Sequence, residues 1–174
     1  MNLPERKPLQ LKDYDYSQNG GYFITFCTEN RAPILGHIVV GGGVLDAPQV
    51  ELSAAGQITK QCICGLEPFY PWLTVANYVI MPNHVHLLLL VQDGPPGTSA
   101  PTGKTIPQLI STIKRLTNRA WGTPLWQRGY YDHILRDEQD FLFHSDYIET
   151  NPGKWAEDEY HILHKTRSRF DWGF

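Results

Sequence analysis

The fold is decided by the stretch from Leu73 to Val91, which reads LTVANYVIMPNHVHLLLLV. It contains two runs, Leu73–Ile80 and His84–Val91, that are rich in the aliphatic, aromatic and β-branched residues typical of strands. Met81-Pro82-Asn83 lies between them and has the residue types of a tight turn. We therefore predict a β-hairpin, and its apolar composition places it at the centre of a sheet.

Further strand and helix patterns surround this hairpin. They predict a strand at 22–27, a hairpin with strands at 38–40 and 44–45, a helix from the N-cap Ser53 to Cys64, an amphipathic helix at 106–121, a strand at 130–135 and a helix at 138–150. This order indicates an α+β fold. We expect a single-domain ferredoxin-like sandwich, with a mainly antiparallel sheet and helices packed on one face.

Length and composition limit the classes of protein. The chain has 174 residues, of which 41% are hydrophobic, so it suffices for one domain with its own core. No apolar run approaches the roughly 20 residues of a membrane span, and we expect no membrane partner. Three cysteines without zinc-ligand spacing are typical of a cytoplasmic protein. We predict a flexible loop at 92–103 and an acidic tail at 156–174, whose Asp158 faces away from any nucleic acid.

Charge is distributed unevenly along the chain. The formal net charge is −3, which by itself argues against a nucleic-acid partner. Residues 104–136, the basic segment, nevertheless contain six Lys or Arg side chains and Asp132 as their one acidic side chain. Such a segment is either an electrostatic footprint for nucleic acid or a set of charges that pair across the fold.

Two histidines, His84 and His86, occupy alternate positions of the second hairpin strand. Side chains at i and i+2 of a strand project from the same face, so both imidazoles can bind one divalent cation. The run around them is almost wholly apolar, and polar rings buried there need partners. Two histidines on a wetted face, or one hydrogen-bonded core histidine, would explain the motif without a metal.

A tyrosine and an asparagine, Tyr147 and Asn151, lie one turn apart on the last predicted helix and share a face. A tyrosine oxygen is a nucleophile that can form a covalent intermediate. An amide oxygen is a suitable ligand for Mg²⁺ or Mn²⁺. The same two residues are also ordinary as a core tyrosine and as a helix terminator before Pro152.

Basic and aromatic residues alternate in the stretch WQRGYY at 126–131. Such interleaving suits a single nucleic-acid strand, because charges follow the phosphates and rings stack on the bases. An aromatic loop packed on the sheet would have the same pattern. The residues that we expect to bind nucleic acid are Lys114, Arg115, Arg119, Trp126, Gln127 and Arg128.

Three blocks together resemble the single-tyrosine HUH transposases, in which HUH stands for His-hydrophobic-His. The blocks are NYVIMPNHVHLL at 77–88, WQRGYYDH at 126–133 and DYIETNP at 146–152. The chain is most similar to the branch of REP-associated tyrosine transposases, over about residues 21–155. By this resemblance, His84 and His86 match the catalytic metal-binding pair, Tyr147 the nucleophile and Asn151 the third metal ligand.

The resemblance implies a ferredoxin-like fold, Mg²⁺ or Mn²⁺ as cofactor, and single-stranded DNA beside a palindromic hairpin as partner. The implied activity is that of an endonuclease and strand transferase in which Tyr147 forms a 5′-phosphotyrosine bond. A monomer and a homodimer are both compatible with it. Two other hypotheses stand beside this one: a catalytically inactive hairpin-DNA-binding protein, and a metal-dependent phosphodiesterase that uses water.

Overall fold

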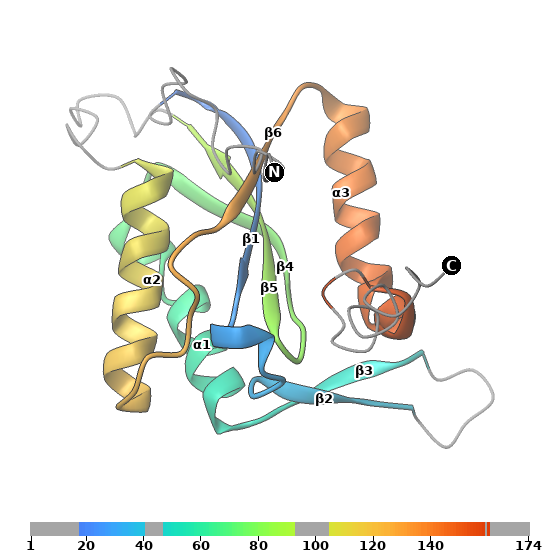
Figure 1. The fold of residues 1–174 in the computed structure, drawn as a ribbon. Coiled ribbons are helices and arrows are strands. Elements are labelled where there is room, and N and C mark those ends of the chain that lie inside the picture. Colours follow the sequence, from blue (N-terminus) through green and yellow to red (C-terminus); the bar gives the residue numbers. More distant parts are fainter. Residues whose placement is uncertain (1–17, 41–46, 93–104, 159, 161–174) are drawn as a thin grey trace, which may run out of the picture.

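The computed structural model describes residues 18–40, 47–92, 105–158 and 160. Four strands form one antiparallel sheet in the order β4-β5-β1-β6 (Figure 1). Their bounds are β1 Gly20–Cys27, β4 Leu73–Ile80, β5 His84–Val91 and β6 Tyr131–Leu135. The predicted hairpin is confirmed as β4 and β5. Only its second strand is central, because β5 pairs with β4 on one side and with β1 on the other, whereas β4 lies at an edge of this sheet and not at the predicted centre.

A two-stranded sheet and three helices complete the fold. The remaining elements are β2 Gly36–Val39, β3 Gln49–Leu52, α1 Ala54–Cys64, α2 Ile106–Trp121, α3 Glu138–Thr150, and the 3₁₀ helices η1 Glu29–Arg31, η2 Glu67–Phe69 and η3 Asn151–Glu157. The antiparallel pair of β2 and β3 confirms the short hairpin, although its second strand is 49–52. The strand expected at 44–45 and all of the predicted loop except Gln92 lie outside the described residues. None of the described helices combines the length and apolar character needed to cross a membrane.

Capping interactions explain where the helices begin and end. At the start of α1, the Ser53 hydroxyl accepts a hydrogen bond from the Gly56 backbone N–H at 3.2 Å. Thr105 and Gln108 form a reciprocal capping box at the start of α2. Gly122 ends α2 in the left-handed conformation, with φ of 91°, which glycine adopts without steric cost.

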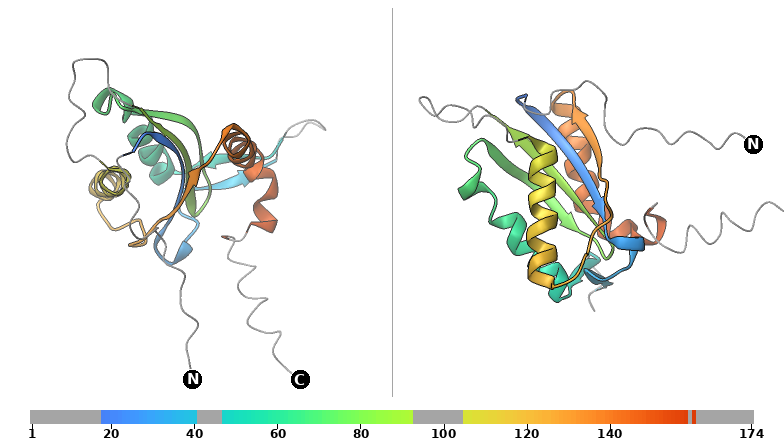
Figure 2. Two further views of the ribbon diagram at one scale, coloured as in Figure 1. Left: turned by 90° about the horizontal axis from the view of Figure 1, so that it is seen from above. Right: turned by 60° about the vertical axis from the view of Figure 1, so that its left-hand side comes forward.

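The two faces of the central sheet carry different side chains. Alternate residues of β1 and β5, among them Ile24, Phe26 and Leu87, point into a large hydrophobic core with α1 and α2. We call this the core face. The residues between them point to the opposite side, where Phe23 and Leu88 contact Ile148 of α3. We call this the site face, and Figure 2 shows α3 on it, across the sheet from α1 and α2.

The α+β class and the antiparallel sheet are confirmed, but the helices divide between the two faces, whereas the sequence predicted them on one. The reason lies in the central strands. Every residue of β1 after Gly20 is buried, and seven of the eight residues of β5 are buried. Strands that are apolar on both faces need cover on both. Helix α3 supplies this cover on the site face, above Phe23 and Leu88.

Candidate active site

The histidine pair lies on the site face of β5 and is enclosed. His84 is 0% exposed and His86 is 1% exposed. Their Nε2 atoms are 3.0 Å apart, so the two rings point these nitrogens at each other. The register of the sheet places Cys27 opposite His84 and Thr25 opposite His86. Adjacent strands and the i, i+2 spacing thus produce the paired rings that the sequence predicted to share a face.

The other ring nitrogens of the pair have partners that orient the rings. The Asn83 amide nitrogen donates to the backbone oxygens of Arg31 and Tyr160, at 3.1 and 2.8 Å, which leaves the Asn83 Oδ1 as an acceptor. His84 Nδ1 therefore donates its hydrogen to that oxygen at 2.9 Å, and its Nε2 keeps a lone pair. Without an ion, His86 Nε2 then donates its hydrogen to His84 Nε2 at 3.0 Å, and His86 Nδ1 accepts from the Thr25 hydroxyl at 2.7 Å. With an ion bound, that hydrogen would move to His86 Nδ1, and the Thr25 hydroxyl would accept it. Partners of this kind orient metal-binding histidines.

Both imidazoles are neutral at pH 7. Burial, with the nearby His86 and Arg31 charges as smaller causes, lowers the pKa of His84 well below its ordinary value of 6.5. Burial, with His144 as a smaller cause, lowers the pKa of His86 to about 3. A neutral imidazole is the form that binds a metal ion, so the burial of the pair favours ligand chemistry.

Asp158 is a third ligand candidate that the sequence did not predict. Its Oδ2 lies 3.9 Å from His84 Nε2, and its side chain is 1% exposed. One ligand atom each of His84, His86 and Asp158 fits within 4.8 Å of the others. The expectation that this residue faces away in an acidic tail is therefore corrected. The rings of Trp155 and Tyr160 pack near His84, with centroids 6.0 and 4.7 Å away, and this packing brings Asp158 inward.

Asn151, the predicted third ligand, begins η3 directly after α3 and is 1% exposed. Its Oδ1 is buried and has no hydrogen-bond partner among the described residues. A buried amide oxygen without a partner is costly, and a bound cation would satisfy it. Two converging imidazole nitrogens and the buried Asp158 carboxylate are a donor set that fits a divalent metal ion.

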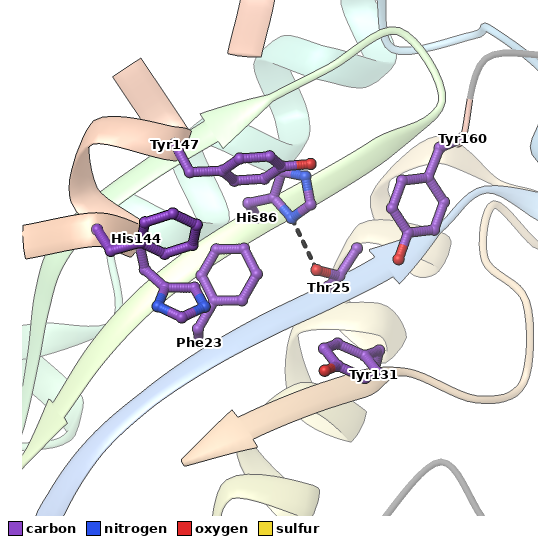
Figure 3. A pocket seen from close by; sticks show the side chains of 8 residues that line it. Phe23, Thr25, His86, Tyr131, His144, Tyr147 and Tyr160 are labelled. Atoms are coloured by element: carbon purple, nitrogen blue, oxygen red, sulfur yellow. Dashed lines mark hydrogen bonds between the residues drawn. The ribbon is translucent and has the colours of Figure 1, made fainter. Parts of the chain in front are cut away.

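Tyr147 lies beside the histidine pair. Its ring centroid is 5.3 Å from that of His86 and 6.0 Å from that of Phe23. All three residues line one pocket of about 530 Å³, whose other lining residues are Thr25, Tyr131, Phe143, His144 and Tyr160. Figure 3 shows Tyr131, Tyr147 and Tyr160 around the Thr25–His86 hydrogen bond. The fold thus brings the predicted nucleophile together with the predicted metal ligand His86 in one pocket.

One hydrogen bond caps the start of α3, and another joins the helix to the sheet. The Asp137 carboxylate caps the helix by accepting from the Asp140 backbone N–H at 2.9 Å. Near the other end, the Asn77 amide of β4 donates to the Ser145 hydroxyl at 3.0 Å. Tyr147 lies two residues after Ser145, so this contact fixes the part of the helix that bears it.

Several predicted nucleic-acid residues belong instead to the core face. Trp126 is 6% exposed, and its ring packs edge-on against Phe26. Its Nε1 donates to the Thr117 hydroxyl at 2.7 Å. The Lys114 ammonium donates to the backbone oxygens of Gln127 and Gly129 at 2.8 and 2.7 Å, and burial lowers its pKa to about 8. These contacts join α2 to the segment before β6.

The arginines remain at the surface. Arg115 and Arg119 on α2, and Arg128 after it, are exposed, and Gln127 is half-buried. Helix α2 covers the core face, so its two arginines lie across the sheet from the histidine pair. The structure therefore does not bring the arginines of α2 together with His84, His86 and Tyr147.

Sequence reasoning missed Thr25, Tyr131, Asp158 and Tyr160 as parts of the site. Thr25 carried a signal, because it is the one polar residue of an otherwise apolar or aromatic strand segment, YFITFC. Its position opposite His86 follows from the sheet register, which the sequence does not contain. Asp158 carried no signal, since its burial depends on how the chain turns after η3.

Comparisons with known proteins agree with this geometry. No family model matches the chain. An uncharacterized protein of Haemophilus influenzae is 31% identical over 179 residues, covering 92% of this chain and 95% of that protein. The REP-associated tyrosine transposase of Escherichia coli K12 is 28% identical over 139 residues, covering 80% of this chain and 70% of that protein.

A solved structure shares the fold. It is that of a REP-associated tyrosine transposase bound to a REP hairpin, with a TM-score of 0.59 and 20% sequence identity. The match covers 95% of this chain and 92% of that one. The relatives' names lead to one conclusion: the chain is a relative of the REP-associated tyrosine transposases.

Proposed function

We propose that this protein is a metal-dependent enzyme that cuts and rejoins single-stranded DNA beside a hairpin, through a covalent bond to Tyr147. One observation carries the proposal: two buried, neutral imidazoles converge, and one of them, His86, lines a single pocket together with Tyr147. The named relatives are transposases, which supports a DNA substrate.

The metal site of this proposal has His84 and His86 as its ligands, each through Nε2. Asn151 and Asp158 would supply the oxygen ligands, because each has a buried oxygen in this part of the fold. When bound, a Mg²⁺ or Mn²⁺ ion would polarise the scissile phosphate and stabilise the charge of its transition state. Asn83 and Thr25 keep the two rings in place for this purpose.

Tyr147 is the nucleophile in the proposed reaction. Its phenolic oxygen attacks the phosphorus atom and forms a 5′-phosphotyrosine bond as the bond to the 3′ oxygen breaks. The phenol gives up its proton as it attacks, and the departing 3′ oxygen takes up a proton and becomes a hydroxyl group. In the reverse direction the same hydroxyl attacks the phosphotyrosine, so strands are joined without hydrolysis.

The pocket suits a single strand better than a duplex. Tyr131 and Phe143 line it and are 47% and 67% exposed, which leaves aromatic faces available to unpaired bases. We propose that bases beside the scissile phosphate stack there. This role was expected of Trp126, whose burial on the core face prevents it. Exposed Arg128 would meet phosphates, so binding should weaken with salt.

The test is an adduct assay with an oligonucleotide that carries a palindromic hairpin and a single-stranded flank. With Mn²⁺ present, a denaturing gel should show a covalent protein–DNA band that His84→Ala abolishes. Cleaved DNA with 5′-phosphate ends and no adduct would favour the phosphodiesterase hypothesis. Hairpin binding without cleavage in Mg²⁺ or Mn²⁺ would favour an inactive DNA-binding protein.

A further inference from the structure

A second cluster of ligand-type side chains lies at the other end of α3 from Asn151. His133 of β6 places its Nε2 at 2.9 Å from the Asp140 Oδ2. His144, one turn after Asp140 on α3, places its Nδ1 at 3.1 Å from the Asp140 Oδ1. The two imidazole rings are stacked, with centroids 4.7 Å apart and planes at 25°. Each ring thus directs one nitrogen at the same carboxylate.

This arrangement has the composition and size of a three-ligand metal site. Ligand atoms of His133, Asp140 and His144 fit within 4.8 Å of one another. A tetrahedral ion with bonds of about 2.0–2.1 Å separates its ligands by roughly 3.4 Å, which is within this span. Two imidazoles with one carboxylate suit divalent transition metals better than Mg²⁺ or Ca²⁺. A fourth position would remain for water.

The surroundings of the cluster permit an ion to enter. The side chains of His133, Asp140 and His144 are 27%, 19% and 13% exposed. They are therefore partly accessible to solvent and partly packed against neighbouring residues. The Arg136 backbone N–H donates to the Asp140 Oδ2 at 3.1 Å, and Asp140 itself stands in the capped first turn of α3. The carboxylate is therefore held in place, as a ligand of a small site should be.

Without an ion, hydrogen bonds hold the same atoms together. His144 Nδ1 lies 2.8 Å from the Asp140 backbone oxygen and donates to it in that state. Because a neutral imidazole carries one ring hydrogen, a shift of that hydrogen to Nε2 frees Nδ1 for an ion. The same three side chains can therefore form either a hydrogen-bonded cluster without an ion or a metal site with one. A metal-binding experiment distinguishes these two possibilities.

We infer that His133, Asp140 and His144 form a second site for a divalent transition-metal ion such as Zn²⁺, separate from the site at His84 and His86. The ion would join the edge strand β6 to the first half of α3, three residues before Tyr147. Its role is to hold the helix that bears Tyr147 against the sheet. The inference concerns metal binding alone and does not depend on the proposed reaction.

The test measures Zn²⁺ stoichiometry on the full-length protein by equilibrium dialysis and elemental analysis. We expect about two ions per wild-type chain. The double variant His84→Ala, His86→Ala should keep one ion, and adding His133→Gln to it should weaken that remaining affinity by more than about 100-fold. His37→Gln is the matched control, because His37 is an exposed histidine with an acidic neighbour, Glu51, at 3.5 Å. It should leave both ions bound.

Circular dichroism checks that each variant is folded. Anomalous diffraction from the wild-type protein is a second test, and it needs no variant. Crystals of the wild-type protein with stoichiometric Zn²⁺ should give an anomalous peak between His133 and His144. The inference is overturned if the wild type binds one ion that disappears with His84 and His86, or if the second ion survives His133→Gln. An anomalous peak at His84 and His86 alone would overturn it as well.

Discussion

The two faces of the central sheet differ in how their polar groups are used. On the core face, polar groups complete the packing: the Lys114 ammonium and the Trp126 indole both donate to fixed acceptors of the protein. On the site face, ring nitrogens of His84 and His86 point at each other, and the buried Asp158 carboxylate lies 3.9 Å from His84 Nε2. The difference separates a structural face from a face prepared to bind a ligand.

The same comparison explains why the basic segment is not one functional unit. Its Lys114 and Trp126 belong to the core face, whereas Tyr131 and His133 at its end belong to β6 and the site face. Neighbouring residues in the sequence therefore have opposite roles. The predictions for Ile110 and Thr117 test whether a substitution on the core face leaves binding at the site face unchanged, and the others test the site face itself.

The largest expected effect on stability is at the core face. Ile110 of α2 is 1% exposed, and Ile110→Ala should lower the free energy of unfolding by about 2–5 kcal/mol. Leu116 of the same helix is 40% exposed, and Leu116→Ala should change it by less than about 0.5 kcal/mol. Urea titrations measure both values. A folded Ile110→Ala protein should keep its metal affinity, and a parallel loss of that affinity would contradict the separation of the faces.

The next effect concerns single-strand binding at the site face. Phe143→Ala removes an exposed ring beside the pocket and should cost about 1–3 kcal/mol of affinity for an unpaired oligonucleotide, by loss of one stacked base. Phe69 is 75% exposed and lies in η2, outside this pocket, so Phe69→Ala is the matched control. Fluorescence anisotropy measures the affinities. Equal losses for both variants would remove Phe143 from the proposed path of the strand.

A comparable effect on stability should follow from one core-face hydrogen bond. Thr117→Val leaves the buried Trp126 Nε1–H without its acceptor, which should cost about 1–3 kcal/mol of unfolding free energy. Thr74→Val, at an exposed position of β4, is the control and should be nearly neutral. DNA affinity of the folded Thr117→Val protein should equal that of the wild type. A loss of DNA affinity at full stability would show that Trp126 acts in binding.

The last effect is expressed per pH unit and is a pH dependence of the metal-free protein. The pKa of His84 and that of His86 are lowered in the folded state, so between about pH 3 and 6.5 the unfolded chain binds more protons. Stability is then fully present above pH 6.5 and is lost as the pH falls. Each histidine should contribute a slope of about 1.4 kcal/mol per pH unit. Urea titrations in EDTA should show the slope reduced in His86→Phe, and an unchanged slope would contradict the burial argument.

The sequence predicted most elements because their signals are local. Helix α2 follows from Ile106, Ile110 and Ile113 at helical spacing, and α1 from the N-cap Ser53. The shared face of His84 and His86 follows from strand periodicity alone. The sequence pattern did not predict the position of α3. That position depends on which face of the sheet the other helices leave uncovered, and the central strands are apolar on both faces. Asp158 and Thr25 reach the pair only through chain packing and sheet register.

The central claim is that Tyr147, held beside the histidine pair, becomes bonded to DNA. Three tyrosines line the pocket, and each can be changed to phenylalanine with the loss of a single oxygen. In the hairpin oligonucleotide assay with Mn²⁺, Tyr131→Phe and Tyr160→Phe should still give the covalent band, and Tyr147→Phe should give none. A covalent band of wild-type intensity from Tyr147→Phe would contradict the account.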